Sequence, residues 1–147
     1  MTSAEIVAIC ISEKKGTVKK PIEKGVFRHN HGLEGDSHTG SWHRQISLLA
    51  IEAVDTLPAH FRDQITSGAF AENILTRGIE LHTLPIGTRL RVGTSLMEVT
   101  QIGKECHQGC EIRRLTGDCV MPRMGIFCQV LEDGIARPGD SIILENE

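Results

Sequence analysis

Residues 89–102 read RLRVGTSLMEVTQI, and this stretch is the clearest guide to the class of fold. Residues 89–92 and 95–102 are short segments rich in apolar and β-branched side chains, separated only by Gly93 and Thr94. Such segments are typical of β-strands, and glycine supplies the backbone dihedral angles that a tight reversal needs. We therefore predict two strands joined by a turn at Val92-Gly93-Thr94.

The same pattern recurs along most of the chain, where 15 glycines and five prolines punctuate apolar segments of strand length. Further turns are predicted at residues 85–87 and 137–140. The predicted strands are residues 4–12, 45–49, 73–76, 89–92, 95–102, 126–131 and 141–145. Several short strands without strict strand–helix alternation or an internal repeat favour a mainly β fold, a closed or nearly closed β-barrel with a few short helices.

Helical patterns are sparse. Residues 50–64 lack glycine and place Ile51, Val54 and Leu57 at helical spacing, but Pro58 limits any single helix. We therefore predict two short helices there, and a further helical turn at residues 110–115.

The composition is that of an ordinary globular chain. A length of 147 residues, with 39% hydrophobic and 24% charged residues, predicts one domain over residues 1–147. The net charge of −3 and the 3% aromatic content argue against a nucleic-acid partner. No apolar run approaches the roughly 20 residues that cross a bilayer, and no secretory signal is visible. Five cysteines, an odd number, suit a reducing compartment, so we expect a cytoplasmic protein with no membrane partner.

Residues 103–114, GKECHQGCEIRR, combine two thiols, an imidazole and three cations. Lysine and arginine lower the pKa of a nearby thiol, which makes Cys110 a candidate nucleophile. An alternative is a zinc or iron–sulfur site at Cys106, His107, Cys110 and Cys119, although their spacing contains no second ligand pair. The remaining cysteines, Cys10 and Cys128, lie in apolar strand patterns, so we expect burial to raise the pKa of their thiols and shield them.

Residues 28–45, RHNHGLEGDSHTGSWHRQ, hold four of the seven histidines and three glycines. We call this stretch the glycine–histidine loop. Arg28 and Arg44 carry guanidinium groups suited to phosphate or carboxylate, so an anion or cofactor pocket is one interpretation. A polar surface loop with scattered histidines is the other.

Taken together and in order, several segments resemble the MOSC domain family, found at the C-terminus of molybdenum-cofactor sulfurases and in small stand-alone bacterial proteins. The segments are residues 32–38, 43–45, 70–74, 84–87, 103–110, 121–127 and 138–140. The resemblance implies a β-barrel that binds the molybdenum cofactor (molybdopterin), or carries sulfur as a persulfide, or both. It makes Cys110 the sulfur-carrying candidate, with Cys106 and His107 as further catalytic candidates.

The cofactor is a phosphorylated pterin, so its pocket should present cations. The cofactor-binding candidates are Arg44, His38, Asp36, Lys104, Arg113, Arg114 and Arg123. The chain has no room for a pyridoxal phosphate domain, so the expected sulfur donor is a separate cysteine desulfurase and the acceptor is the cofactor or a molybdoenzyme. Two alternatives remain: a pterin-binding module without sulfur transfer, and a zinc-stabilised structural or interaction protein.

Overall fold

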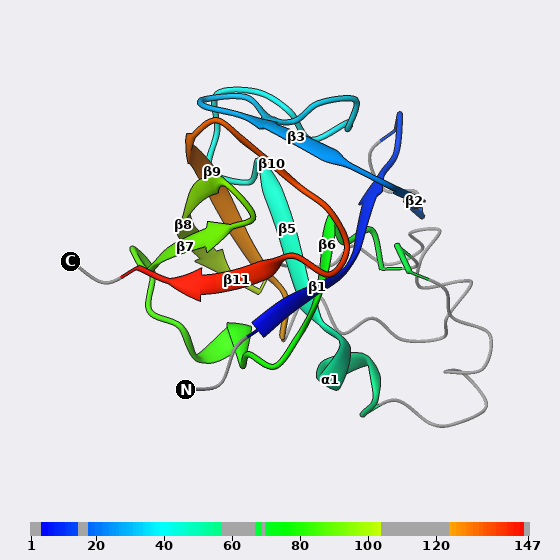
Figure 1. Cartoon of the computed structure of the whole chain (residues 1–147), viewed down its shortest axis with the longest axis vertical. Coiled ribbons are helices and arrows are strands. Elements are labelled where there is room, and N and C mark those ends of the chain that lie inside the picture. Colours follow the sequence, from blue (N-terminus) through cyan, green and yellow to red (C-terminus); the bar gives the residue numbers. More distant parts are fainter. Residues whose placement is uncertain (1–3, 15–17, 57–66, 69, 104–123, 146–147) are drawn as a thin grey trace.

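The computed structural model describes residues 4–14, 18–56, 67–68, 70–103 and 124–145. Within these ranges the chain forms eleven strands, one short α-helix and one 3₁₀ helix (Figure 1). The elements are β1 (Ala4–Ile11), β2 (Lys20–Ile22), β3 (Gly25–Arg28), β4 (Gly32–Leu33), β5 (Ile46–Ala50), α1 (Ile51–Val54), β6 (Ile74–Arg77), η1 (Leu81–Thr83), β7 (Arg89–Val92), β8 (Ser95–Ile102), β9 (Ile126–Glu132), β10 (Gly134–Ala136) and β11 (Ser141–Leu144).

Seven of the described strands close into a barrel. Hydrogen-bonded neighbours follow the order β11, β7, β8, β9, β5, β6, β1, and β1 pairs back with β11. The β5–β6 pair is parallel, and the other neighbours in the barrel are antiparallel. β2 pairs with β1 beside the barrel, and a separate sheet of order β10, β3, β4 lies across the top of the view in Figure 1, opposite α1. The predicted barrel is confirmed.

The seven strands predicted from sequence are the seven barrel strands, with each end within one residue of its observed position. The predicted turn at residues 92–94 joins β7 to β8, and the predicted turns at residues 85–87 and 137–140 precede β7 and β11. Four further strands, β2, β3, β4 and β10, are two to four residues long and were not predicted from the sequence. The 3₁₀ helix η1 was not predicted either.

The first predicted helix is present as the four-residue α1. The second predicted helix falls largely within residues 57–66, and the predicted helical turn falls within residues 104–123, so both lie outside the described residues. Among the residues that are described, no helix has the length and apolar character needed to cross a membrane.

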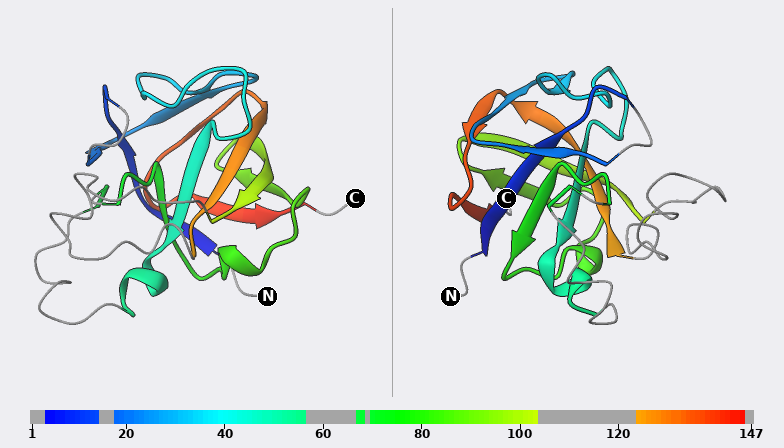
Figure 2. Two further views of the ribbon diagram at one scale, coloured as in Figure 1. Left: turned by 180° about the vertical axis from the view of Figure 1, so that it is seen from behind. Right: turned by 90° about the vertical axis from the view of Figure 1, so that its right-hand side faces the viewer.

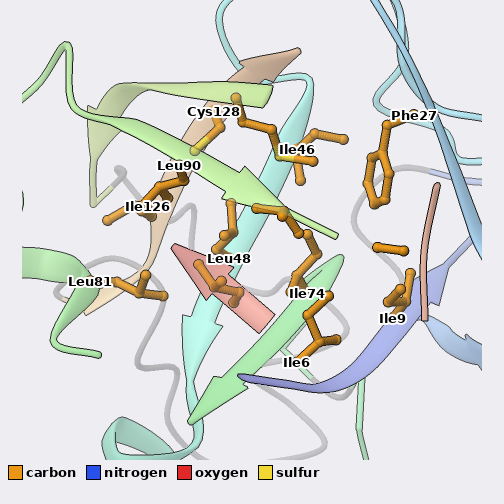
Figure 3. Close-up of a cluster of buried hydrophobic side chains, with 14 of the residues drawn as sticks. Ile6, Ile9, Phe27, Ile46, Leu48, Ile74, Leu81, Leu90, Ile126 and Cys128 are labelled. Atoms are coloured by element: carbon orange, nitrogen blue, oxygen red, sulfur yellow. The ribbon is translucent and has the colours of Figure 1, made fainter. Parts of the chain in front are cut away.

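Aliphatic side chains fill the barrel. Figure 3 shows Leu48, Ile74 and Leu90, from three different strands, pointing toward one another, and each is fully buried. A second apolar cluster includes Leu49 and Phe127, and the neighbours Leu48 and Leu49 belong to different clusters because successive strand residues face opposite sides of a sheet. All five residues of β5 are buried, so both faces of this strand are covered.

Candidate functional site

Arg44 lies just before β5 and reaches two neighbouring strands. Its Nε donates a hydrogen bond of 2.9 Å to Oε1 of Gln101 on β8, and its guanidinium carbon lies 5.3 Å from the centre of the Phe127 ring on β9. Gln101 and Phe127 are register partners in the β8–β9 ladder, so Arg44 spans that strand pair. Arg44 is half-buried, and within the described ranges its two terminal nitrogens make no hydrogen bond.

The side chain of Gln101 forms hydrogen bonds with Arg44, His43 and Gly103, and we call this group the Gln101 node. Oε1 of Gln101 also lies 2.9 Å from Nε2 of His43, and Nε2 of Gln101 donates to the carbonyl of Gly103 at 2.8 Å. Because arginine can only donate, the Gln101 atom facing Arg44 is the oxygen, and Nε2 of His43 therefore carries a hydrogen. The hydroxyl of Thr100 donates to the carbonyl of His43, which fixes the backbone beside Arg44 to β8.

The node lies next to the point where the β8–β9 ladder ends. Ile102 pairs with Ile126, and the amide of Gly103 donates to the carbonyl of Gly125 at 2.7 Å. Residues 104–123, which we call the cysteine segment, connect these two ends and lie outside the described residues. The predicted site residues in the cysteine segment are Lys104, Cys106, His107, Cys110, Arg113, Arg114 and Arg123.

A buried ion pair supports the glycine–histidine loop. Nζ of Lys19 lies 2.7 Å from Oδ1 of Asp36, and both side chains are fully buried. Oδ1 also accepts the amide of Ser12 at 3.0 Å, and Oδ2 accepts the amide of His38 at 3.1 Å. Burial opposes the charge of Asp36, but the hydrogen bond and positive charge of Lys19, together with the hydrogen bond from the amide of Ser12, hold the pKa of its carboxyl well below the usual range. Because the carboxylate of Asp36 is buried and both of its oxygens accept hydrogen bonds, a ligand would contact the neighbours of Asp36 and not Asp36 itself.

Three aromatic rings connect this ion pair with the Gln101 node. The rings of His38 and Trp42 are parallel with centres 6.3 Å apart, and the ring of His43 meets Trp42 edge-on at 6.0 Å. Nε1 of Trp42 also donates to the carbonyl of His38 at 2.7 Å. The structure thus brings three predicted residues, Asp36, His38 and Arg44, into one continuous network.

Two members of this network, Lys19 and Gln101, were not predicted from the sequence. Lys19 stands in a lysine-rich stretch that resembles a solvated surface, and Gln101 is an ordinary polar residue of a strand. Their partners are 17 and 57 residues away in the chain, so no local pattern could have shown the contacts.

A second buried carboxylate lies close to Lys19. Oε2 of Glu72 accepts the amide of Gly68 at 2.6 Å, and Oε1 accepts the amide of Phe70 at 3.1 Å. Gly68 in turn accepts the amide of Lys19 at 2.8 Å through its carbonyl. Burial raises the pKa of the Glu72 carboxyl, so this group stabilises the local turn at an electrostatic cost.

The two cysteines expected to be unreactive are buried, as predicted. Burial and the nearby Glu72 carboxyl raise the pKa of the Cys10 thiol to about 12. Burial likewise raises the pKa of the Cys128 thiol. Neither thiol can act as a nucleophile near neutral pH.

The first histidines of the glycine–histidine loop, His29 and His31, are exposed. Arg28 is committed to carboxylates, with Nε 2.8 Å from Glu34 and a terminal nitrogen 3.6 Å from Asp133. In the part of the chain that the structure describes, no three His, Cys, Asp or Glu residues are grouped as metal ligands. The residues of the alternative zinc site lie in the cysteine segment, outside the described residues.

A groove of about 1050 Å³ is lined in part by residues of α1. The helix α1 lies at the opposite end of the barrel from the β3 sheet (Figure 2). The lining of the groove is mostly apolar and includes Ala53, Ile79, Met124 and Ile142. None of the residues described as lining it belongs to the Arg44 network, so the groove and the candidate site are separate features.

The fold is shared with solved bacterial structures. Over 97% of this chain and 94% of the other, YuaD from Bacillus subtilis superposes with a TM-score of 0.74 at 21% identity. YiiM from Geobacillus stearothermophilus gives 0.72 at 20% identity over 97% and 75% of the two chains, and YiiM from Escherichia coli gives 0.70 at 18% over 100% and 71%. At these identities the likeness concerns the fold. No curated protein matches the sequence.

The model of the MOSC domain family matches residues 35–143. The matched range contains the barrel strands from β5 to β9 and all but the last residue of β11, and it runs through Asp36, His38, Arg44 and the whole cysteine segment. The chain therefore belongs to the MOSC domain family.

Proposed function

We propose that this protein binds the molybdenum cofactor beside Arg44 and carries sulfur on Cys110 for transfer to that cofactor or to a molybdoenzyme. The observation that carries the proposal is the position of Arg44. Its guanidinium is held at Gln101, three residues before Lys104, the first residue of the segment that contains Cys106 and Cys110. MOSC family membership, which is linked with molybdenum-cofactor sulfurases, supports the same assignment.

The geometry of Arg44 fits a phosphorylated ligand. A guanidinium binds phosphate best through two parallel N–H groups, which requires that the group be held and that one edge be open. Gln101 binds the Nε side and Phe127 supports the plane, while the terminal nitrogens make no hydrogen bond to described residues. Arg44 is the residue that would hold the cofactor phosphate. The bound cofactor would supply the molybdenum chemistry.

The length of the β8–β9 connection also favours a functional role. Strands that pair antiparallel, as β8 and β9 do up to Ile102 and Ile126, can be joined by a few residues. Here residues 103–125 intervene, far more than the pairing of the two strands requires. This connection contains Cys106, His107 and Cys110 with four of the predicted cations, the setting that lowers a thiol pKa.

The proposed sulfur transfer is a thiol exchange that needs no external oxidant. The Cys110 thiolate attacks the outer sulfur of a persulfide on a separate pyridoxal phosphate-dependent cysteine desulfurase. A new S–S bond forms at Cys110, the S–S bond of the donor breaks, and the donor cysteine leaves as a thiolate. An acceptor thiolate then attacks the outer sulfur of the Cys110 persulfide, the new S–S bond forms on the acceptor, and Cys110 leaves as a thiolate. Delivery to the cofactor as sulfide takes two further electrons, which a second thiolate supplies by attacking Sγ of Cys110: the S–S bond of the persulfide breaks, sulfide leaves, and the two thiols end as a mixed disulfide.

Mass spectrometry tests the sulfur-carrier part. After incubation with a cysteine desulfurase and cysteine, the wild-type protein should gain about 32 Da, one sulfur atom, on the peptide that contains Cys110. The gain should be lost in Cys110→Ser and kept in the matched variant Cys119→Ser. If Cys110→Ser gains the same mass, or the wild type gains none, the carrier assignment is wrong.

Pterin retention tests the binding part. Arg44→Met preserves packing against Phe127 while removing the donors, so we expect retention of the pterin to fall by about 10- to 150-fold, the loss of a hydrogen bond to a charged group. The matched control is Arg77→Met, which removes an exposed arginine paired with Glu5 on the barrel. Equal retention in both variants would remove Arg44 from the site. Pterin without any sulfur adduct would favour the binding-module alternative, and stoichiometric zinc would favour the structural one.

A further inference from the structure

We propose that Lys19 is a positioning residue that holds His38 in its Nε2–H tautomer, so that the imidazole offers a neutral hydrogen-bond donor to an oxyanion. The tautomer follows from the hydrogen bonds of the described residues alone. Only the identity of the oxyanion, a phosphate of the cofactor, rests on the proposed function.

The ammonium group of Lys19 determines which nitrogen of His38 carries the ring hydrogen. The ammonium has three N–H groups and is fully buried, so each needs an acceptor within the protein. Three acceptors surround Nζ: Oδ1 of Asp36 at 2.7 Å, Oγ of Ser12 at 3.1 Å and Nδ1 of His38 at 3.2 Å. All three N–H groups of Lys19 have an acceptor only if Nδ1 of His38 accepts a hydrogen bond.

The opposite tautomer of His38, with its hydrogen on Nδ1, does not provide an acceptor for every N–H group of Lys19. A hydrogen on Nδ1 would point toward the ammonium and leave the third N–H of Lys19 without an acceptor, which is unfavourable for a buried donor. Oδ2 of Asp36 lies farther from Nδ1, at 3.5 Å, and already accepts the amide of His38. The hydroxyl of Ser37 lies 3.5 Å from Nδ1 and can rotate to donate to it, so this group is compatible with an accepting Nδ1.

With Nδ1 accepting, the ring hydrogen of His38 lies on the other nitrogen, Nε2. No residue within the described ranges accepts a hydrogen bond from this nitrogen. The His38 side chain is 21% exposed, so the donor is accessible to a ligand. The parallel ring of Trp42, together with the hydrogen bond from its Nε1 to the His38 carbonyl, limits rotation of the imidazole.

The Nε2–H group of His38 is suited to bind an anionic oxygen of a ligand. His43 also carries a hydrogen on Nε2, but that hydrogen is committed to Gln101. Of the two histidines, His38 therefore has the Nε2–H group that is free to bind a ligand. The rings of Trp42 and His43 connect His38 with the Gln101 node, which holds Arg44. A neutral N–H group can donate to one oxygen of an oxyanion, and Arg44, which the rings of Trp42 and His43 connect with His38, carries further donors for such a ligand.

The tautomer can be read directly by nitrogen-15 NMR of histidine-labelled, cofactor-free protein. Long-range proton–nitrogen correlations at neutral pH should show a protonated Nε2 and an unprotonated Nδ1 for His38. A protonated Nδ1 in the wild type would overturn the proposal without any variant. The double variant Lys19→Met/Asp36→Asn, which removes both buried charges, should show a mixture of tautomers. An unchanged Nε2–H tautomer in that folded variant would also refute the positioning role.

Two isosteric substitutions test the donor with inorganic phosphate as the probe. The amide nitrogen of a glutamine at position 38 can reach the place of Nε2, whereas that of an asparagine stays near the place of Nδ1. We expect phosphate to shift the His38 Nε2 signal of the wild type. We also expect His38→Gln to bind phosphate within about threefold of the wild type and His38→Asn about tenfold more weakly.

Equal weakening in His38→Gln and His38→Asn, or no shift with phosphate, would refute the donor role. These measurements use cofactor-free protein and leave Cys110 untouched. Failure of the proposed sulfur transfer would therefore leave their outcome unchanged, and their failure would not bear on the sulfur adduct.

Discussion

Replacing Asp36 by alanine removes the carboxylate that balances the buried ammonium of Lys19. Breaking a buried ion pair at one partner costs about 3–5 kcal/mol because the other charge stays in a low-dielectric site. The substitution also removes acceptors for the amides of Ser12 and His38, so the upper part of that range is expected. A domain of this size is typically stable by about 5–15 kcal/mol, so the variant should still fold at 25 °C.

The exposed pair Arg28–Glu34 provides a matched control. Its N–O distance is 2.8 Å, against 2.7 Å for Lys19–Asp36, but its side chains are 50% and 48% exposed where those of the buried pair are 0%. Exposed pairs contribute about 0–1 kcal/mol. Glu34→Ala should therefore lower stability by less than about 1 kcal/mol, although the ion-pair geometry is nearly the same.

Urea and thermal unfolding measure the difference. At about 2–4 °C per kcal/mol, Asp36→Ala should lower Tm by roughly 6–20 °C, and Glu34→Ala should lower it by no more than about 4 °C. In Lys19→Met/Asp36→Asn neither charge remains, so most of the lost stability should return. If Asp36→Ala and Glu34→Ala destabilise equally, burial does not set the strength of the pair and the reasoning fails.

The same carboxylate sets an acid limit to stability. The pKa of Asp36 is lower in the folded protein than its value of about 3.9 in an unfolded chain. Its contribution is therefore complete above about pH 4, and it is lost as the pH falls from there toward the folded pKa. Asp36→Asn should be less stable than the wild type at neutral pH, with the gap narrowing below about pH 4. A gap that stays constant down to pH 2 would contradict the assignment.

Two further predictions concern reactivity and backbone strain. In a time course of iodoacetamide labelling read by peptide mapping, Cys110 should react first while Cys10 and Cys128 react slowly, because burial raises the pKa of the latter thiols; early labelling of either would remove the chemical basis of the carrier assignment. Gly68→Ala should destabilise far more than Gly87→Ala in urea unfolding. Both glycines have positive φ, +87° and +96°, but an added Cβ at Gly68 would lie 2.1 Å from the carbonyl oxygen of Lys19, whereas nothing lies within 4 Å at Gly87.

The barrel could be predicted from sequence because its strands are long enough to show a pattern. β8 has eight residues and a clear reversal before it at Gly93, and both of its ends were predicted. β4 has two residues and β2 contains Pro21, so neither carries a readable alternation of apolar and polar side chains. These short strands form through pairing with β3 and β1, which is tertiary information.

The site was only partly predictable for the same reason. The glycines and histidines of the glycine–histidine loop pointed to Asp36, His38 and Arg44, because local sequence marks an irregular polar loop. The groups that orient them, Lys19 and Gln101, come from other parts of the chain and are brought in by barrel closure. The predicted cofactor-binding roles of Asp36, His38 and Arg44, and the predicted roles of residues in the cysteine segment, stay predictions.

The buried ion pair is better explained by orientation than by stability. A well-packed apolar pair of similar volume would be as stable as Lys19–Asp36 or more so, because desolvation offsets most of the attraction between the charges. An apolar pair could not accept the amides of Ser12 and His38, which tie the end of β1 to the glycine–histidine loop. It also could not donate to Nδ1 of His38. We therefore infer that the two charges orient the imidazole of His38. A substitution that restores stability without these charges should leave the barrel intact, but His38 should then populate both tautomers.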